Sequence, residues 1–160
     1  MQVYKLVPHS TVLSEQKVLQ SKWVFHLICN EHGNPAHFKS QLVVRGFEQV
    51  FGQDYIETMS PTPHIESLWL ILHLAAVNNW NVQQIDVKTA YLYGELPADK
   101  TIFMEQAEGF AESRKEDWVW QLQCGLYGMK QSGWIWNKTM NKALLSWGFK
   151  RLSVDSCVYY

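Results

Sequence analysis

The order of hydrophobic and polar positions predicts a β-hairpin in the N-terminal half of the chain. Residues 22–29 are rich in aromatic and branched side chains, residues 30–35 are dense in turn formers, and residues 36–45 are extended again. Two such runs around a glycine-containing turn are typical of antiparallel strands. The polar stretch from His9 to Ser21 has no strong period, so it is predicted to be a loop.

A different spacing predicts two helices. Residues 65–77 are apolar nearly all round, which indicates a helix buried on more than one side, and Thr62 before Pro63 matches an N-cap followed by proline. A second helix is expected from residue 132 or 133 to residue 147, ended by Gly148. Its predicted core stripe consists of Trp136, Met140, Ala143, Leu144 and Trp147.

Residues 81–87 alternate as a half-buried strand does, and Asp86 stands at the end of this run. Residues 89–94 are expected to form a short turn or helical piece closed by glycine. The helix at 65–77 should pack on the Asp86 strand, and shorter strands are predicted at 101–104 and 118–122. The fold class is therefore α+β, with helices on a small sheet.

Only a few side chains are candidates for binding or catalysis. A carboxylate at a sheet rim, such as Asp86, can bind Mg²⁺, but it can equally be a cap or turn former. Lys39 and Arg45 could bind an anion, or they could be solvated cations that discourage edge pairing. Histidines without carboxylate or cysteine companions are not expected to bind metal, which applies to His26, His32, His37, His64 and His73.

The amino-acid composition limits the structural class of the protein and the partners it could bind. A chain of 160 residues, 47% hydrophobic and 18% charged, fits one globular domain or parts of two. Eight Trp, seven Tyr and seven Phe favour a packed core, or a surface that stacks on bases. The net charge of −1 gives no global attraction to nucleic acid, so such binding must use local patches.

The cysteines and the lengths of the apolar runs indicate where in the cell the protein is expected. Cys29, Cys124 and Cys157 are odd in number and form no C-x-x-C pair, which favours a reducing intracellular setting, cytoplasm or nucleus. No run reaches the length of a membrane span, and no signal peptide is visible at the N-terminus, so no membrane association is expected.

Five blocks of residues carry a family resemblance. They are Lys-Trp-Val-Phe at 22–25, Leu-Val-Val-Arg-Gly-Phe at 42–47, Gln-Ile-Asp-Val-Lys-Thr-Ala-Tyr-Leu at 84–92, Met-Glu-Gln-Ala-Glu-Gly-Phe at 104–110 and Leu-Tyr-Gly-Met-Lys-Gln at 126–131. In this order and spacing, from residue 4 to residue 160, the chain resembles the reverse transcriptase domain of copia-type retrotransposon polyproteins, an RNA-dependent DNA polymerase.

The resemblance implies a right-hand polymerase fold that this chain covers incompletely. Residues 1 to about 80 would be fingers and the first palm helix, and about 81–160 would be a partial palm with returning fingers elements. The sheet would then be a truncated palm sheet. An apolar face at Val82, Ile85 and Val87 is expected to stay uncovered.

The resemblance also implies roles for six residues. Asp86 would be the first palm carboxylate, catalytic and part of a site for two Mg²⁺ ions, with Val87 beside it in that metal site. Two such ions would activate the primer hydroxyl and stabilise the leaving pyrophosphate. The implied nucleotide-binding residues are Tyr91 beneath the sugar, Lys39 at the triphosphate, and Tyr127 and Gly128 beside the nucleotide and template.

The chain departs from the family pattern at several positions. Family members usually have Arg where Gln41 and Trp69 stand, and Pro-Arg at 133–134, where this chain has Gly-Trp. A neutral amide at position 41 should weaken triphosphate binding. The family's Tyr-x-Asp-Asp hairpin is not reached either, so the isolated chain is expected not to extend a primer.

Three functional hypotheses follow. The first is an RNA-directed DNA polymerase segment whose partners are an RNA or DNA template-primer, deoxynucleoside triphosphates, and the remaining palm or RNase H segments of a polyprotein. The second is a non-enzymatic remnant that acts as a nucleic-acid-binding or interaction module. The third is an unrelated aromatic-rich α+β domain, which would place Asp86 away from any sheet rim or cleft.

Overall fold

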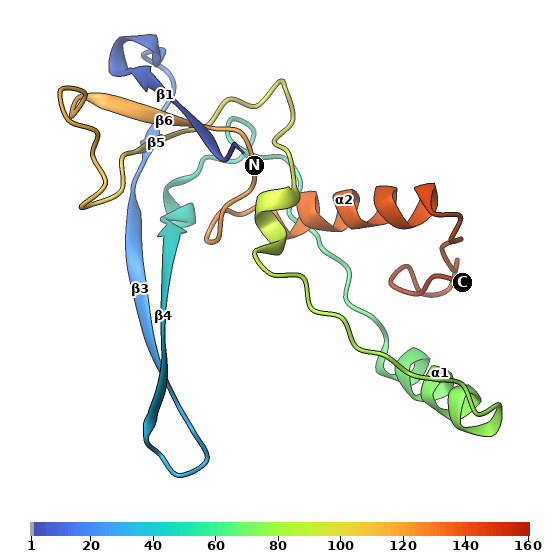
Figure 1. Cartoon of the computed structure of the whole chain (residues 1–160). Helices are drawn as coiled ribbons and strands as arrows, with labels where there is room; N and C mark the ends of the chain where they lie inside the picture. The colour runs from blue at the N-terminus through green and yellow to red at the C-terminus, as the bar shows by residue number, and fades with distance from the viewer. Residues whose placement is uncertain (1) are drawn as a thin grey trace.

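The structure is a computed structural model that describes residues 2–160, and it has the expected α+β class. Its larger sheet consists of β1 (Tyr4–Pro8), β2 (Val18–Leu19), β5 (Phe103–Glu105) and β6 (Trp118–Leu122), in the order β1-β6-β5-β2. The β1–β6 and β5–β6 pairs are antiparallel (Figure 1). Strand β2 runs parallel to β5.

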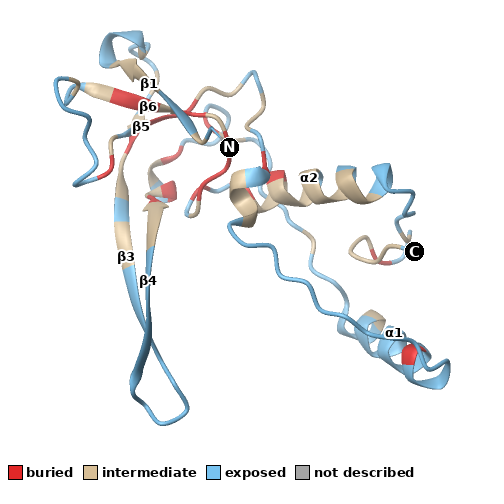
Figure 2. Ribbon diagram, viewed as in Figure 1, coloured by how far each residue is buried: buried red, intermediate tan, exposed pale blue. Residues whose placement is uncertain are grey.

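The hydrophobic core lies at this sheet. Figure 2 shows buried residues gathered along β5, β6 and the chain that leaves them. Leu19, Ile102 and Met104 are at most 2% exposed, and Tyr4 stacks on Trp120 with ring centroids 4.2 Å apart. Burial of Leu19 explains why the predicted loop at 9–21 was wrong in part: β2 forms there, after the short 3-10 helix η1 (His9–Thr11).

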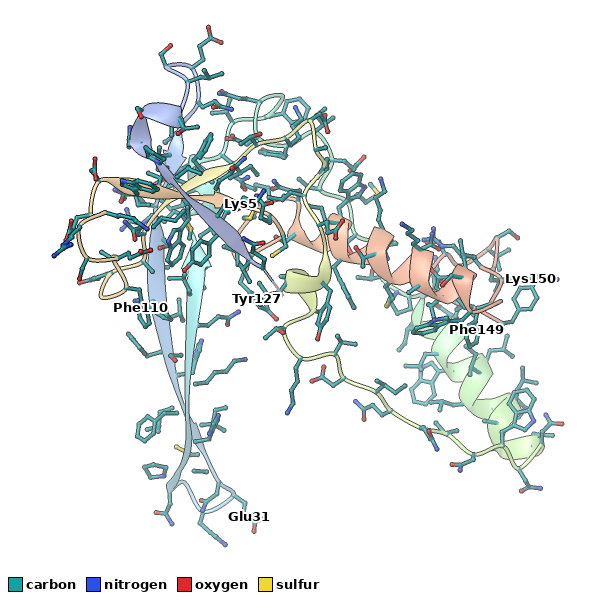
Figure 3. All side chains as sticks on the ribbon, turned by 45° about the horizontal axis from the view of Figure 1, so that its top comes forward. Lys5, Glu31, Phe110, Tyr127, Phe149 and Lys150 are labelled. Atoms are coloured by element: carbon teal, nitrogen blue, oxygen red, sulfur yellow. The ribbon has the colours of Figure 1, made fainter. Side chains whose placement is uncertain are left out.

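The predicted hairpin is confirmed. Strands β3 (Ser21–Cys29) and β4 (Pro35–Val44) pair antiparallel with Lys22 opposite Val43 and His26 opposite Lys39. The hairpin leaves the larger sheet and projects as a long arm, with Glu31 at its far end (Figures 1 and 3). Its outer part is exposed on both faces, while its base at Val44 is buried.

Helix α1 (Ile65–Val77) confirms the predicted helix but not its packing. It lies apart from the larger sheet (Figure 1), and of its residues only Ala75 is buried. The predicted strand at 81–87 is also wrong, because all seven residues are exposed and have no regular structure. A strand needs a neighbour for its backbone N–H and C=O groups, and none lies along this stretch. The helix N-cap is His64, not Thr62.

The C-terminal turn holds the start of α1. Arg151 and Tyr159 form a β-bridge, and the turn between them presents the buried carboxylate of Asp155. This carboxylate accepts hydrogen bonds from the backbone N–H groups of His64 and Cys157, each at 2.9 Å. Hydrogen bonds from the Ser67 side chain and from these two amides hold the pKa of Asp155 below its ordinary value. Asp155 thus caps α1 from outside the helix.

Helix α2 (Ser132–Ser146) forms as predicted and packs on η3 (Ala90–Tyr93). Its predicted core stripe was wrong at its last residue, since Trp147 is 72% exposed. The other four stripe residues are half-buried, and the fully buried residues of α2 are Ser132 and Ile135. The remaining 3-10 helix is η2 (Gly46–Glu48). Within residues 2–160, no helix has the length and apolar character that crossing a bilayer requires.

Candidate nucleotide and nucleic-acid site

The loop before α2 crosses the base of the hairpin in close contact. Gly128 has a φ of +91°, and the Val44 N–H donates a 2.8 Å hydrogen bond to the Tyr127 carbonyl oxygen. A Cβ at Gly128 would overlap the Val44 carbonyl oxygen, and one at Gly46 would overlap the Gly128 carbonyl oxygen. Gly128 is therefore required both for its positive φ and for the space that a side chain would fill, and Gly46 is required for space alone.

The buried side-chain amides of Gln49 and Gln131 hold the same loop in place. The Gln49 side chain accepts a 2.8 Å hydrogen bond from the Lys130 N–H and donates one of 3.1 Å to the Gln131 side chain. Gln131 in turn donates to the Asp54 carbonyl oxygen at 3.2 Å. Gln49 and Gln131 are 7% and 4% exposed, and a buried amide that lost its partner would destabilise the fold by about 1 to 3 kcal/mol. This network holds the start of α2 against the segment after β4.

Tyr91 and Tyr127, two of the predicted nucleotide-binding residues, are in contact. Their ring centroids lie 4.7 Å apart at an interplanar angle of 49°, and Figure 3 shows Tyr127 beside η3. Tyr91 comes from η3, which the contact with α2 holds in place. Thr89 enters η3 with a φ of +53°, which is rare for a β-branched residue and is found where the surrounding structure enforces it. The two tyrosines and Gly128 therefore form one cluster.

Asp86 and Val87 lie in the exposed stretch just before this cluster. Asp86 is at neither a sheet rim nor a strand end, so its predicted local setting was wrong, although it stands only five positions before Tyr91 in the chain. Val87 is 44% exposed, and its only possible metal ligand is its backbone carbonyl oxygen.

The two faces of the hairpin differ, and one of them is turned to the cluster. Val43 Cγ1 would lie 2.7 Å from a Cβ at Gly128, so the Val43 side chain points at that loop. Alternate residues of a strand share a face. Gln41 and Lys39 therefore continue the Val43 face outward along β4, each about 7 Å beyond the previous one. Lys39 is exposed, and Gln41 is half-buried.

The opposite face carries an aromatic row that the sequence reasoning did not single out. The Trp23 ring lies 6.5 Å from Phe25 and 5.3 Å from Phe110 between centroids. Trp23 Nε1 also donates to the Glu108 carbonyl oxygen at 3.1 Å. Figure 3 shows Phe110 beside β3. The period-two placement of Trp23 and Phe25 was the available signal, whereas the hydrogen bond from Trp23 to Glu108 beside Phe110 spans 85 positions and no local pattern reveals it.

A hollow of about 660 Å³ opens on this row and is also lined by Lys22 and Arg45. The Arg45 guanidinium hydrogen-bonds to the Gln20 side chain and lies 3.9 Å from the Glu48 carboxylate. Arg45 is therefore held in place by the fold where it lines this hollow, whereas Lys22 is exposed.

Comparison with known proteins identifies the family. The family model described as "Reverse transcriptase (RNA-dependent DNA polymerase)" matches residues 1–160. The chain belongs to this family. The resemblance to copia-type reverse transcriptases is confirmed, and the hypothesis of an unrelated aromatic-rich domain is wrong.

The relatives are retrotransposon polyproteins. The chain is 38% identical over 157 residues to the retrovirus-related Pol polyprotein from transposon TNT 1-94 of Nicotiana tabacum, covering 98% of the chain and 11% of the relative. It is 32% identical over 146 residues to that of transposon RE1 of Arabidopsis thaliana, covering 91% and 10%. The truncated transposon Ty1-A Gag-Pol polyprotein of Saccharomyces cerevisiae is 29% identical over 150 residues, covering 92% and 12%.

The chain thus spans about a tenth of the length of these curated relatives. No solved structure matches it.

Reverse transcriptases generally use Mg²⁺, and the residues present fit that ion in part. Carboxylate and carbonyl oxygens are suitable ligands, and Asp86 and Val87 carry one of each. In the described part of the chain, no group of three or more His, Cys, Asp or Glu side chains could hold a metal. Asp86 therefore brings one acidic ligand, too few for two ions.

Proposed function

We propose that this chain is the nucleotide-binding and template-binding part of an RNA-directed DNA polymerase. The observation that carries the proposal is the Tyr91–Tyr127–Gly128 cluster, which lies just after Asp86 and against the hairpin face that carries Lys39. Residues remote in sequence come together there, from β4, η3 and the loop before α2. In the proposal, residues up to about 80 are fingers and the first palm helix, and the rest is palm with returning fingers elements.

Each residue of the cluster has a distinct proposed task. The Tyr91 ring lies beneath the sugar of a deoxynucleotide and excludes a 2′-hydroxyl by its bulk, and Tyr127 fixes that ring by contact. Gly128 lets the loop lie directly against β4, which places its backbone and Tyr127 beside the nucleotide and template. The Lys39 ammonium meets the triphosphate as a point charge. Mg²⁺ held by Asp86 and Val87 would supply charge stabilisation for nucleotidyl transfer.

The binding part of the proposal has a matched pair of variants. Tyr91→Ala should weaken binding of a deoxynucleoside triphosphate to a chain–template-primer complex by about tenfold, because a stacked aromatic contact is worth on the order of 1 kcal/mol or more. Tyr93→Ala is the control, since Tyr93 lies in the same η3 and is 53% exposed. Equal affinity of the two variants in a fluorescence titration would contradict the proposed site.

The catalytic part is tested by primer extension with Mg²⁺ and deoxynucleotides. The purified 160-residue chain should not extend a primer, because Asp86 alone does not supply the acidic ligands for two ions. Template-dependent extension that Asp86→Asn leaves intact would show that the assignment of Asp86 is wrong. Extension that this substitution abolishes would show instead that another acid completes the site.

A second candidate function rests on the aromatic row at Trp23, Phe25 and Phe110. Phe25 and Phe110 are exposed and Trp23 is half-buried between them, and Lys22 and Arg45 line the same hollow. Aromatic rings beside cations bind single-stranded nucleic acid by stacking, and each stacked base is worth about 1 to 3 kcal/mol. A non-enzymatic nucleic-acid-binding module would need this surface but not Asp86. Trp23→Ala should weaken binding of a single-stranded oligonucleotide by roughly tenfold or more, whereas the exposed Trp147→Ala should not. Binding that needs Trp23 but is accompanied by no nucleotide binding would favour this module.

A further inference from the structure

The hairpin face turned toward Gly128 carries a cross-strand pair of basic residues. His26 of β3 is directly opposite Lys39 of β4, and Ile28 is opposite His37. Residues directly opposite each other in an antiparallel pair have their side chains on the same face. His26 therefore shares the face of Lys39, Gln41 and Val43, and His37 is its diagonal neighbour.

This face has no carboxylate to neutralise it. Neither β3 nor β4 contains Asp or Glu, and none of the ion pairs among residues 2–160 includes His26, His37 or Lys39. Glu31 lies in the turn beyond, 3.6 Å from His32. The other charged group on β3 is Lys22, opposite Val43 at the base. The charged and titratable groups around His26 are thus all bases.

Both side chains of the pair are exposed to solvent. The hollow of about 290 Å³ on the hairpin is lined mainly by residues of the other face, Phe25, Leu27 and Phe38, so the pair stands on an open surface. Gln41, the next residue on this face toward Gly128, offers an amide and no charge. An anion that reaches Lys39 along this face therefore meets the His26 imidazole as its nearest further donor of positive charge.

We propose that His26 is a second, titratable ligand for the triphosphate that Lys39 binds. The inference rests on the proposed function, because it takes the nucleotide to be the anion on this face. Histidine gains its charge between about pH 8 and pH 5, and the imidazolium has two N–H donors suited to phosphate oxygens. His26 supplies on protonation the second positive charge that Gln41 does not. The contribution of His26 to triphosphate binding therefore grows as pH falls.

The experiment measures binding of dATP and of inorganic tripolyphosphate to the full chain by calorimetry at about pH 5.5 and pH 8. The phosphates themselves gain protons over this range, so the informative quantity is the ratio of wild-type to variant affinity at each pH. For His26→Gln that ratio should rise to about fivefold at the lower pH, the scale of one exposed ion pair, and fall to one at the higher pH. His32→Gln, in the hairpin turn, should stay at one at both.

The outcomes separate this inference from the proposed function. Lys39→Gln should weaken binding at both pH values, because lysine keeps its charge throughout. Loss of binding in Lys39→Gln with an unchanged ratio in His26→Gln would overturn the role of His26 alone. No binding by the wild-type chain at either pH, or no effect of Lys39→Gln, would overturn the nucleotide site and this inference together. A ratio that rises for His37→Gln and stays at one for His26→Gln would overturn the role of His26 and place the titratable ligand at the diagonal position.

Discussion

The crossing of Gly128 over the base of the hairpin yields a prediction whose control lies in the same molecule. Gly128 and Gly33 have φ values of +91° and +79°, so alanine at either position meets nearly the same backbone strain, about 1 to 2 kcal/mol. The two sites differ only in their surroundings. A Cβ at Gly33 has nothing within 4 Å, whereas one at Gly128 meets the carbonyl oxygen of Val44 and lies 2.7 Å from Val43 Cγ1.

The extra penalty at Gly128 follows from these contacts. The loop must move away from β4, which lengthens the Val44–Tyr127 hydrogen bond and forfeits about 1 kcal/mol, and the displaced packing adds about 1 to 3 kcal/mol. Gly128→Ala should therefore lower the free energy of unfolding by about 3 to 6 kcal/mol, against about 1 to 2 kcal/mol for Gly33→Ala. The difference corresponds to a lower melting temperature by roughly 5 to 15 °C for a chain of this length.

The assay is urea unfolding of both variants followed by tryptophan fluorescence. Trp120 in the core reports on the sheet to which the crossing is joined, and an unchanged m value would show that only stability has changed. Gly109→Ala, at a φ of +82° with nothing within 4 Å, serves as a second control. If Gly128→Ala is no less stable than these two, the close approach of the loop to β4 does not exist in solution.

Three further predictions concern the acid range, the exposed helix and the amide network. The pKa of Asp155 is lowered in the folded chain, so the ionised carboxylate stabilises the fold above the ordinary pKa of about 3.9, and this stabilisation is lost as pH falls below that value. In acid unfolding curves, Asp155→Asn should remove this pH-dependent loss of stability, whereas the control Asp117→Asn should retain it. Leaving about 300 Å² of apolar surface on α1 and residues 82–87 in water forfeits about 7 kcal/mol, so the chain should self-associate with concentration, and Trp69→Lys should reduce this; a monomer at every concentration in sedimentation velocity would contradict it. Gln131→Leu leaves Gln49 without one partner and should lower the free energy of unfolding by about 1 to 3 kcal/mol, more than Gln53→Leu at the surface, which chemical denaturation would measure.

The elements that the sequence predicted correctly are those whose pattern is local. The hairpin, the strand at 118–122 and both helices follow from period-two or helical spacing, and the structure has all of them. Residues 81–87 show the limit of such reasoning. Their alternation fits a strand, but a strand exists only where a neighbour pairs with it, and in the structure these residues are exposed and unpaired.

The same limit applies to the candidate site. The motif blocks pointed to Tyr91 and Tyr127 separately, but their contact depends on how η3 packs on α2, which no spacing in the sequence encodes. Leu19 was missed for a similar reason, since a two-residue strand is too short to show a period, and its burial arises from pairing with β5. The face of the hairpin on which Lys39 lies became known only through Val43 and Gly128.

Because the hairpin projects from the larger sheet, a small change of angle at its contact with Gly128 becomes a large displacement further along the hairpin. Lys39 stands four residues beyond Val43, about 14 Å along the arm at the rise of an antiparallel strand. A tilt of about 10° at the base would carry Lys39 through about 2.4 Å, several times the 0.5 Å width of the hydrogen-bonding range. The close packing that Gly46 and Gly128 allow at the base of the hairpin therefore determines the position of the Lys39 ammonium. A substitution at either glycine that changes the tilt of the hairpin would displace Lys39 without contacting it.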